Sequence, residues 1–312
     1  MSSTDASPKS SGLLFALSAY GMWGCFPLFF HLLENVSAWE VLVQRIIWAL
    51  IFMLAILAFT GRLRTFLNHL RSPRTLFWMT LSSLLIAMNW LVFIWGVSQH
   101  HVLETSLGYF ITPLLSLLLG RIVLGERMHP LQAVAGGIAT LAVLFELWEL
   151  GRLPWISLSL ATTFALYGLV RKQQPIEALN GLTLETLVLT PIAIAWILWQ
   201  MMNGHPLAFG QSPWISSLLI ASGTLTAIPL LLFAAATRRL DLNVVGFIMY
   251  LNPTLQFLFA VFVFEESYPP QRLITFALIW LAMGFFMAGL WRAHRQRSKP
   301  STHDTVEDSV LD

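Results

Sequence analysis

Charged residues and cysteines are scarce in this chain. Asp, Glu, Lys and Arg together account for 11% of its 312 residues, whereas 56% are hydrophobic and the mean hydropathy is +0.70. A soluble chain of this length could hardly bury so much apolar surface. The single cysteine, Cys25, excludes a disulfide within the chain. The net charge of +2 gives no indication of a nucleic-acid partner.

Sequence motifs of common membrane chemistries are absent too. The chain has no G-x-x-x-x-G-K-S/T phosphate loop, no H-E-x-x-H pair and no G-x-S-x-G turn, which argues against ATP-driven pumps and the commonest hydrolases. A metal site at His100, His101 and Glu104 is disfavoured because adjacent histidines do not share a helix face. We expect no catalytic residue, metal or cofactor. An enzyme without a recognisable motif, a sensor or a scaffold is the alternative to a transporter.

Ten apolar runs, each about as long as a bilayer is thick, make up most of the chain. An α-helix needs about 20 residues to cross about 30 Å of hydrocarbon, where the backbone must satisfy its own hydrogen bonds. The short loops between the runs leave no room for further domains, so the pattern predicts an all-α integral membrane protein with ten transmembrane helices. The predicted spans are Gly12–Leu33, Val41–Phe59, Thr75–Val97, Glu104–Leu124, Leu131–Leu150, Leu153–Val170, Gly181–Met202, Trp214–Ala236, Asn243–Phe264 and Pro270–Trp291.

The basic residues predict how these helices are oriented. If the N-terminus is cytoplasmic, all of the 18 Lys and Arg residues except Arg45, Arg152 and Arg272 fall in cytoplasmic segments. Short cytoplasmic loops of membrane proteins are enriched in Lys and Arg. Both termini and the loop Thr60–Arg74 are therefore predicted to be cytoplasmic.

The chain also contains an internal repeat. Three residues recur 140 positions later in the same order: Pro113, Glu126 and Pro130 match Pro253, Glu266 and Pro270. Because each half holds five spans, an odd number, the second half must enter the membrane inverted. Inverted repeats are typical of alternating-access transporters, whose substrate site lies near the midplane between the repeats. We expect five-helix repeats at 12–150 and 151–291, with disordered cytoplasmic tails at 1–11 and 292–312.

Polar and aromatic side chains near the midplane are the candidates for a substrate path. Neutral donors and ring faces suit a small organic solute, although Ser, Thr and Asn can also simply tie helices together. The candidates are Tyr20, Trp23, Asn89, Trp90, Tyr109, Thr112, Thr224, Thr226, Tyr250 and Asn252. Pro113 and Pro253 are predicted to kink their helices mid-span at matched repeat positions.

Two charged residues within the spans are predicted to form gates. Arg45 lies near the outer end of the second span, at the depth of Glu104. Glu185, the repeat counterpart of Arg45, lies near the inner end, at the depth of Lys172, Arg238 and Arg239. Snorkelling to the headgroups is the alternative for Arg45 and Glu185. No Asp or Glu lies in the central third of any span, so we expect a neutral, zwitterionic or anionic cargo rather than a cation.

Five segments of the chain carry a resemblance to a known family: Ala19–Gly24, Arg45–Trp48, Asn89–Trp90, His100–Pro113 and Phe164–Lys172. They resemble the RarD branch of the EamA permeases within the drug/metabolite transporter superfamily. The resemblance implies a secondary-active or facilitative carrier of a small metabolite in the bacterial inner membrane, without indicating the cargo. The expected partners are a small-molecule substrate and the lipid bilayer; proton coupling, and a monomer or a homodimer, are left open.

Overall fold

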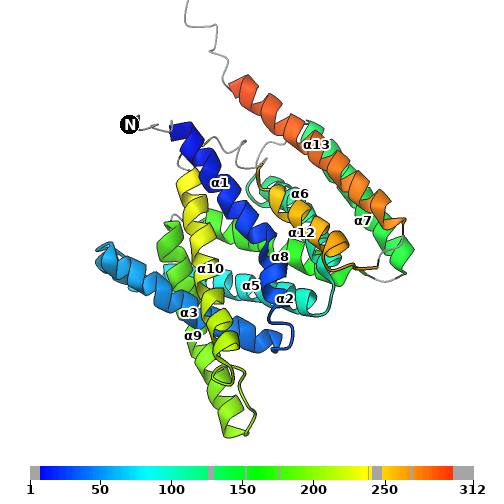
Figure 1. Ribbon diagram of the computed structural model, residues 1–312. Helices are drawn as coiled ribbons and strands as arrows, with labels where there is room; N and C mark the ends of the chain where they lie inside the picture. Colours follow the sequence, from blue (N-terminus) through cyan, green and yellow to red (C-terminus); the bar gives the residue numbers. More distant parts are fainter. Residues whose placement is uncertain are drawn as a thin grey trace, which may run out of the picture.

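Every regular element in the described part of the chain is an α-helix (Figure 1). The computed structural model describes residues 8–125, 130–151, 153–174, 176–237, 239–240, 248–267 and 270–297. The helices are α1 (Pro8–Gly24), α2 (Phe26–His31), α3 (Ala38–Phe59), α4 (Leu63–His69), α5 (Pro73–Ser98), α6 (Val102–Val123), α7 (Pro130–Leu150), α8 (Trp155–Lys172), α9 (Ala178–Met202), α10 (Pro213–Thr237), α12 (Leu251–Phe262) and α13 (Arg272–Arg297). The predicted all-α character is confirmed for these residues.

Membrane-spanning length and composition occur in six segments of the described chain. These are Ser11–His31, Ala38–Phe59, Pro73–Ser98, Val102–Val123, Ala178–Met202 and Pro213–Phe233, with shorter apolar helices at Pro130–Glu146, Leu251–Phe262 and Leu273–Gly289. The outer surface is apolar as well: Phe59, Trp148 and Met202 are 92%, 76% and 86% exposed. Large apolar side chains so exposed fit a lipid environment and not water. The fold is that of a multi-pass helical membrane protein.

The first predicted span, Gly12–Leu33, is not one continuous helix. α1 ends at Gly24, and α2 begins at Phe26 after a turn at Cys25. Pro27 has no amide hydrogen to continue the hydrogen-bond ladder of α1, whereas proline is well tolerated in the first turn of a helix. The break is therefore encoded locally, by a proline that the span prediction did not take into account.

Other helix ends also differ from the predicted boundaries. α1 begins at Pro8, inside the predicted N-terminal tail, and α13 continues to Arg297, six residues beyond the predicted end at Trp291. Apolar character marks where a helix crosses lipid and not where its backbone hydrogen bonds end. The predicted spans therefore leave out the polar turns at the ends of α1 and α13. Residues 1–7 and 298–312 of the predicted tails lie outside the described residues. The predicted span Asn243–Phe264 is described only from residue 248, with a turn at 249–250 before α12.

Helix packing repeats itself between the two halves of the chain. Three contacts of the first-half helices have a counterpart in the second half. The contact α3–α10 corresponds to α9–α5, α1–α10 corresponds to α8–α5, and α1–α12 corresponds to α8–α6. The pairs α3–α9, α6–α12 and α7–α13 join equivalent helices, and α7 and α13 lie side by side along one edge of the molecule (Figure 1). These contacts are thus preserved when α1, α3, α5, α6 and α7 are exchanged for α8, α9, α10, α12 and α13.

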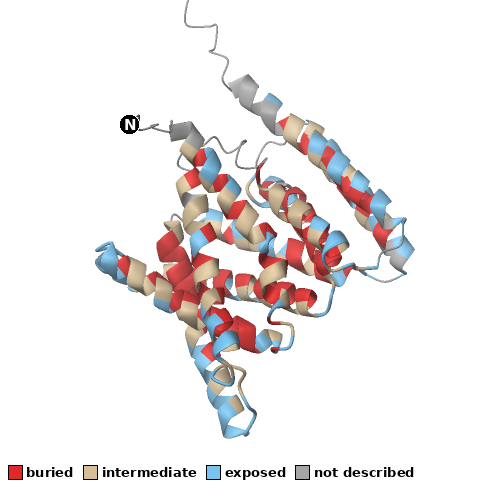
Figure 2. Cartoon of the chain, in the orientation of Figure 1, coloured by how far each residue is buried: buried red, intermediate tan, exposed pale blue. Residues whose placement is uncertain are grey.

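Buried residues gather where the helices of the main body meet (Figure 2). Residues 40–46 of α3 and residues 179–186 of α9 are stretches that are buried at every position. A helix that is buried all round lies inside the protein and not at its lipid surface. The two stretches correspond at the repeat offset of 140, and they carry Arg45 and Glu185.

Candidate functional site

Arg45 lies in the enclosed stretch of α3, where its side chain is 3% exposed. Its Nε donates a hydrogen bond of 2.6 Å to Thr226 Oγ1 of α10. The guanidinium carbon lies 4.3 Å from the ring centroid of Trp90, 5.4 Å from that of Phe30 and 5.7 Å from that of Phe26. These distances are those of cation–π contacts. Its Nη1 is buried and has no hydrogen-bond partner.

Glu185 is fully buried in α9 and is surrounded by donors. Ser82 of α5 donates a hydrogen bond of 2.5 Å to Oε1, and the Tyr167 hydroxyl of α8 donates one of 3.3 Å to Oε2. Arg171 Nε, also of α8, lies 3.7 Å from Oε1 in an ion pair. Gly181, one turn before Glu185, leaves the space that the Arg171 guanidinium fills, because a Cβ there would overlap it. The carboxylate therefore has hydrogen-bond donors and a counter-charge.

The structure does not bring together Arg45 and Glu104, the charge pair predicted for the outer gate. Among the residues that the structure describes, no carboxylate lies within ion-pair distance of Arg45. Glu104, 2% exposed, has His101 Nδ1 3.8 Å from its Oε1 instead. Arg238 lies outside the described residues, and the partner of Glu185 is Arg171. The prediction compared depths in the membrane and ignored helix faces, which decide whether side chains at one depth can meet.

Asn89 and Tyr109, predicted to line the substrate path, are joined to each other. Tyr109 donates a hydrogen bond of 3.3 Å to Asn89 Oδ1, and Asn89 Nδ2 lies 3.0 Å from both Leu160 O and Thr163 Oγ1. The buried amide thus ties α5 to α6 and α8. Trp90, its neighbour in sequence, faces Arg45 instead.

The aromatic candidates on α1 pack on α10. The Tyr20 and Trp23 rings lie 5.3 Å apart, and Phe233 lies 5.9 Å from the first and 6.0 Å from the second. Tyr20 is buried, and Trp23 is half-buried beside the break at Cys25. These rings therefore border the interrupted end of α1.

Tyr250 and Asn252 lie at a second interruption, where α12 begins. The Tyr250 hydroxyl is buried and has no hydrogen-bond partner, while Asn252 Oδ1 accepts a hydrogen bond of 2.7 Å from Gln256. The two interruptions adjoin, since a Cβ on Gly24 would lie 3.3 Å from Asn252 O and 2.7 Å from Leu255. Freed backbone groups at membrane depth are tolerated where they face protein or a cavity.

The predicted threonines and prolines have unequal roles. Thr112 and Thr224 bond to carbonyls of their own helices, at Gly108 and Ala221, as threonines inside helices often do. Thr226 does the same and also accepts from Arg45. Pro113 lies inside α6, which continues to Val123. Pro253, predicted mid-span, lies in the first turn of α12, where its carbonyl accepts a hydrogen bond of 2.8 Å from Ser106.

Two further groupings were not found from the sequence. Glu266 accepts hydrogen bonds from the backbone N–H groups of Val102 and Leu103, at 2.5 and 2.9 Å, and so caps α6 from the other half of the chain. The match of Glu266 to Glu126 in the repeat was the sequence signal that could have pointed to this residue.

A second grouping lies at the end of α2, where ligand atoms of His31, Glu34 and His100 come within 4.8 Å of one another. His31 Nδ1 lies 2.9 Å from Glu34 Oε2, and His100 Nε2 lies 3.8 Å from the same oxygen. These residue types bind transition metals. The sequence reasoning considered His100 with its neighbours only, because nothing in the sequence pairs it with His31.

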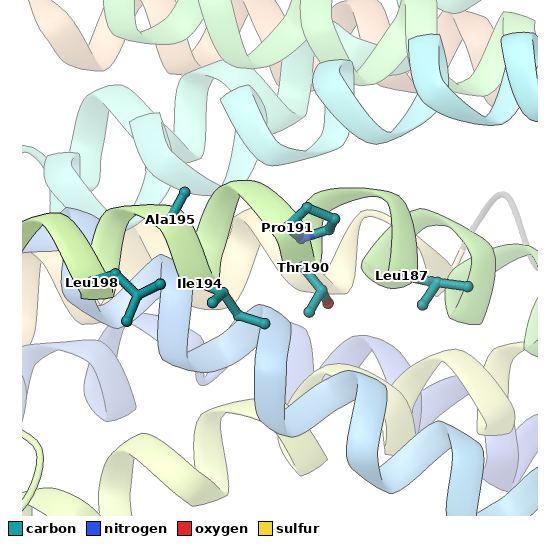
Figure 3. A pocket seen from close by; sticks show the side chains of 6 residues that line it. All are labelled: Leu187, Thr190, Pro191, Ile194, Ala195 and Leu198. Carbon is teal, nitrogen blue, oxygen red and sulfur yellow. The ribbon is translucent and has the colours of Figure 1, made fainter.

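A shallow apolar groove of about 440 Å³ runs along α9 (Figure 3). It is lined by Leu187, Thr190, Pro191, Ile194, Ala195 and Leu198, all from this helix. Ile194 and Leu198 are 46% and 52% exposed, so the groove opens on the outer surface. It contains none of the predicted substrate-path residues.

Comparison with known proteins agrees with the arrangement of these helices. Residues 10–148 match the EamA-like transporter family. Protein RarD of Escherichia coli K12 is 42% identical, and the alignment covers 95% of this chain and 100% of that protein. An uncharacterized transporter of Pseudomonas aeruginosa is 41% identical, and the alignment covers 93% of this chain and 97% of that protein. A solved crystal structure, 17% identical, covers 92% of this chain and 99% of its own with a TM-score of 0.60, which shows a shared fold. The chain therefore belongs to the EamA-like transporter family, in its RarD branch.

Proposed function

We propose that this protein is a permease that moves a small metabolite across the bacterial inner membrane by alternating access. The ten spans are the six long segments together with α7, α8, α13 and the segment that ends in α12, arranged as inverted repeats at 12–150 and 151–291. The observation that carries the proposal is the exchange of helix contacts between the halves, which puts Arg45 and Glu185 at equivalent enclosed positions.

Pseudo-equivalent halves supply a physical basis for transport. Two similar bundles can exchange roles, so outward-open and inward-open states have similar energies and a solute can shift the balance between them. Membership of a transporter family supports the same conclusion. On the orientation predicted from the basic residues, both termini are cytoplasmic.

The Glu185 cluster is the proposed inner gate. Its carboxylate connects α9 to Ser82 of α5 and to Tyr167 and Arg171 of α8. Opening toward the cytoplasm separates α8 from α9 and breaks this buried network, so the cluster stabilises the closed inner side.

The proposed substrate path runs past the two helix interruptions. Discontinuous helices build the midplane sites of many transporters, because their free backbone ends bind solutes. Tyr20, Trp23, Tyr250 and Asn252 lie beside the interruptions, and Asn89 with Tyr109 lies on the adjoining helices. The cargo is neutral, zwitterionic or anionic, because no acidic residue is available at mid-depth for a cation.

Flux measurements in proteoliposomes test the proposal. Metabolite profiles of a deletion strain and an overexpressing strain would first supply candidate cargoes. Uptake of a radiolabelled candidate should saturate and should accelerate when the same compound is present on the other side. Linear flux without trans-stimulation would indicate a channel, and no flux above empty liposomes would reject transport of that candidate. Ile194→Ala, in the outer groove of α9, is a matched control that should leave flux unchanged.

Topology can be tested separately. A reporter that is active only outside the cytoplasm should be silent when fused at Arg74 and active when fused within Asn203–Pro213. The reverse pattern would overturn the orientation without affecting the carrier proposal.

A further inference from the structure

Arg45 is a cation inside the protein, and no residue that the structure describes supplies an anion to it. It is 3% exposed, it has no carboxylate within ion-pair distance in the described ranges, and its Nη1 has no hydrogen-bond acceptor. A charged group at membrane depth is costly, and such residues normally pair with an opposite charge or a polar cavity. Three aromatic rings offset part of this cost but supply no acceptor.

The guanidinium is nevertheless held in a defined orientation. Thr226 fixes Nε, and the Trp90 ring lies 4.3 Å from the guanidinium carbon, which leaves Nη1 as the donor without a role inside the protein. A planar guanidinium with a free donor edge matches the two oxygens of a carboxylate. Preorganised groups of this kind bind their ligand with little loss of entropy.

We infer that Arg45 binds the carboxylate group of the transported metabolite. The inference rests on the proposed function, since it specifies the substrate class of that carrier. Phe26 and Phe30, which flank the guanidinium, lie on α2, the six-residue helix that follows the break at Cys25. Movement of this short helix would uncover Arg45.

A carboxylate fits the enclosure better than a lipid headgroup. A headgroup phosphate remains at the membrane surface, whereas Arg45 is enclosed by α2, α5 and α10. The aromatic rings around the guanidinium also favour a small organic body attached to the anionic group.

The first test compares acids with their neutral amides. The purified full-length protein is titrated with acetate, succinate and lactate, with the corresponding amides and with inorganic phosphate, while its melting temperature is measured. At least one acid should stabilise the protein, with an apparent affinity about tenfold or more above that of its amide. In Arg45→Gln this preference should fall to about one, and Arg45→Lys should retain part of it. Gln44→Met, a buried change one residue away, should leave the preference intact.

The second test supplies the anion as a side chain of the protein itself and needs no ligand. Thr226→Glu places a carboxylate beside Arg45, so this variant should melt at a higher temperature than Thr226→Gln, which has the same size. In the Arg45→Gln background the order should reverse, because the new carboxylate then has no partner. Thr226→Glu should also abolish stabilisation by the acids.

The outcomes separate this inference from the proposed function. Equal effects of acids and amides, stabilisation by phosphate alone, or no effect of any acid would overturn carboxylate binding at Arg45, as would a lower melting temperature for Thr226→Glu than for Thr226→Gln. Saturable, trans-stimulated flux that is unchanged by Arg45→Gln would leave the carrier standing and reject the inference. Binding of acids that depends on Arg45, without any flux, would support a carboxylate site at Arg45 and reject the carrier.

Discussion

Arg45 and Glu185 occupy equivalent positions of the repeat, yet their surroundings differ in kind. Both lie in the enclosed stretches of α3 and α9 and both are nearly inaccessible. Glu185 has two hydroxyl donors and the Arg171 guanidinium around it, whereas Arg45 has one hydroxyl acceptor and three rings. The pattern of helix contacts is thus alike in the two halves, and the chemistry of the two centres is not.

The difference has an energetic meaning. A buried ion pair with satisfied hydrogen bonds stabilises the conformation in which it forms, whereas a buried charge without a counter-ion raises the free energy of its conformation. The Glu185 centre therefore holds helices together. The Arg45 centre keeps an unsatisfied donor, which a ligand can satisfy.

The largest effect on stability is expected when the charge of Glu185 or of Arg45 is removed, and it should differ between the two residues. Glu185→Gln leaves the Arg171 guanidinium without a counter-charge and should lower the free energy of unfolding by about 3 kcal/mol. Arg45→Gln removes a charge that has no counter-ion among the described residues, so its effect on stability should be within about 1 kcal/mol. Thermal and denaturant unfolding of both purified variants would measure the difference.

Uptake of the cargo provides the matched readout for the same pair of variants. Arg45→Gln should lose transport while its melting temperature stays near that of the parent. Equal destabilisation by the two substitutions would mean that Arg45 has a structural partner after all, and the comparison drawn above would fail.

The next expected effect comes from the contact that supports Arg45. A Cβ on Gly223 of α10 would lie 2.5 Å from Ala49 N of α3, so Gly223→Ala must push these helices apart. Overpacking of this kind costs about 1–3 kcal/mol, and the shift should also weaken the bond from Arg45 to Thr226. Gly136→Ala, where a Cβ meets nothing within 4 Å, is the control and should not destabilise the protein. Unfolding measurements on both variants test this, and equal stability would contradict the close approach.

The helices and the family were predictable from the sequence because both depend on long, strong patterns. Apolar runs of bilayer length and the spaced motifs around His100–Pro113 do not require knowledge of packing. The offset of 140 also identifies Arg45 and Glu185 as counterparts in the repeat.

The partners of those charges could not be predicted, because they depend on which helix faces meet. Depth in the membrane favours Lys172, Arg238 and Arg239 as partners of Glu185 and gives no reason to choose Arg171. Adjacent residues such as Arg171 and Lys172 point in directions about 100° apart on a helix. The role of Gly181 is visible only as space for a guanidinium. The helix break at Cys25 was missed for a different reason: the apolar pattern continues through it, while Pro27 interrupts the backbone bonds.

A smaller effect is expected where the Arg171 guanidinium needs its space. Gly181→Ala places a methyl group at the guanidinium position, so Arg171 must move away from Glu185. We expect a loss of about 1–2 kcal/mol, less than for Glu185→Gln because Ser82 and Tyr167 still donate. Gly168→Ala on α8, which meets nothing within 4 Å, should not destabilise. A double-mutant cycle of Gly181→Ala with Arg171→Met would give additive effects if the methyl group did not act through Arg171.

The smallest expected effects compare the single hydroxyl contacts of the two centres. Ser82→Ala removes a donor from the buried Glu185 carboxylate and should cost about 1.5 kcal/mol, because hydrogen bonds to charged groups are among the stronger ones. Thr226→Val keeps the shape of its side chain and removes an acceptor from Arg45. Since Nη1 of Arg45 already lacks an acceptor, we expect Thr226→Val to cost less than about 1 kcal/mol of stability. We also expect weaker binding of acids, because Nε of Arg45 is no longer held in place. Unfolding of the two variants, with and without a stabilising acid, measures both quantities. If Thr226→Val proved the more destabilising variant and left acid binding intact, Arg45 would be the structural centre and Glu185 the better candidate for ligand binding.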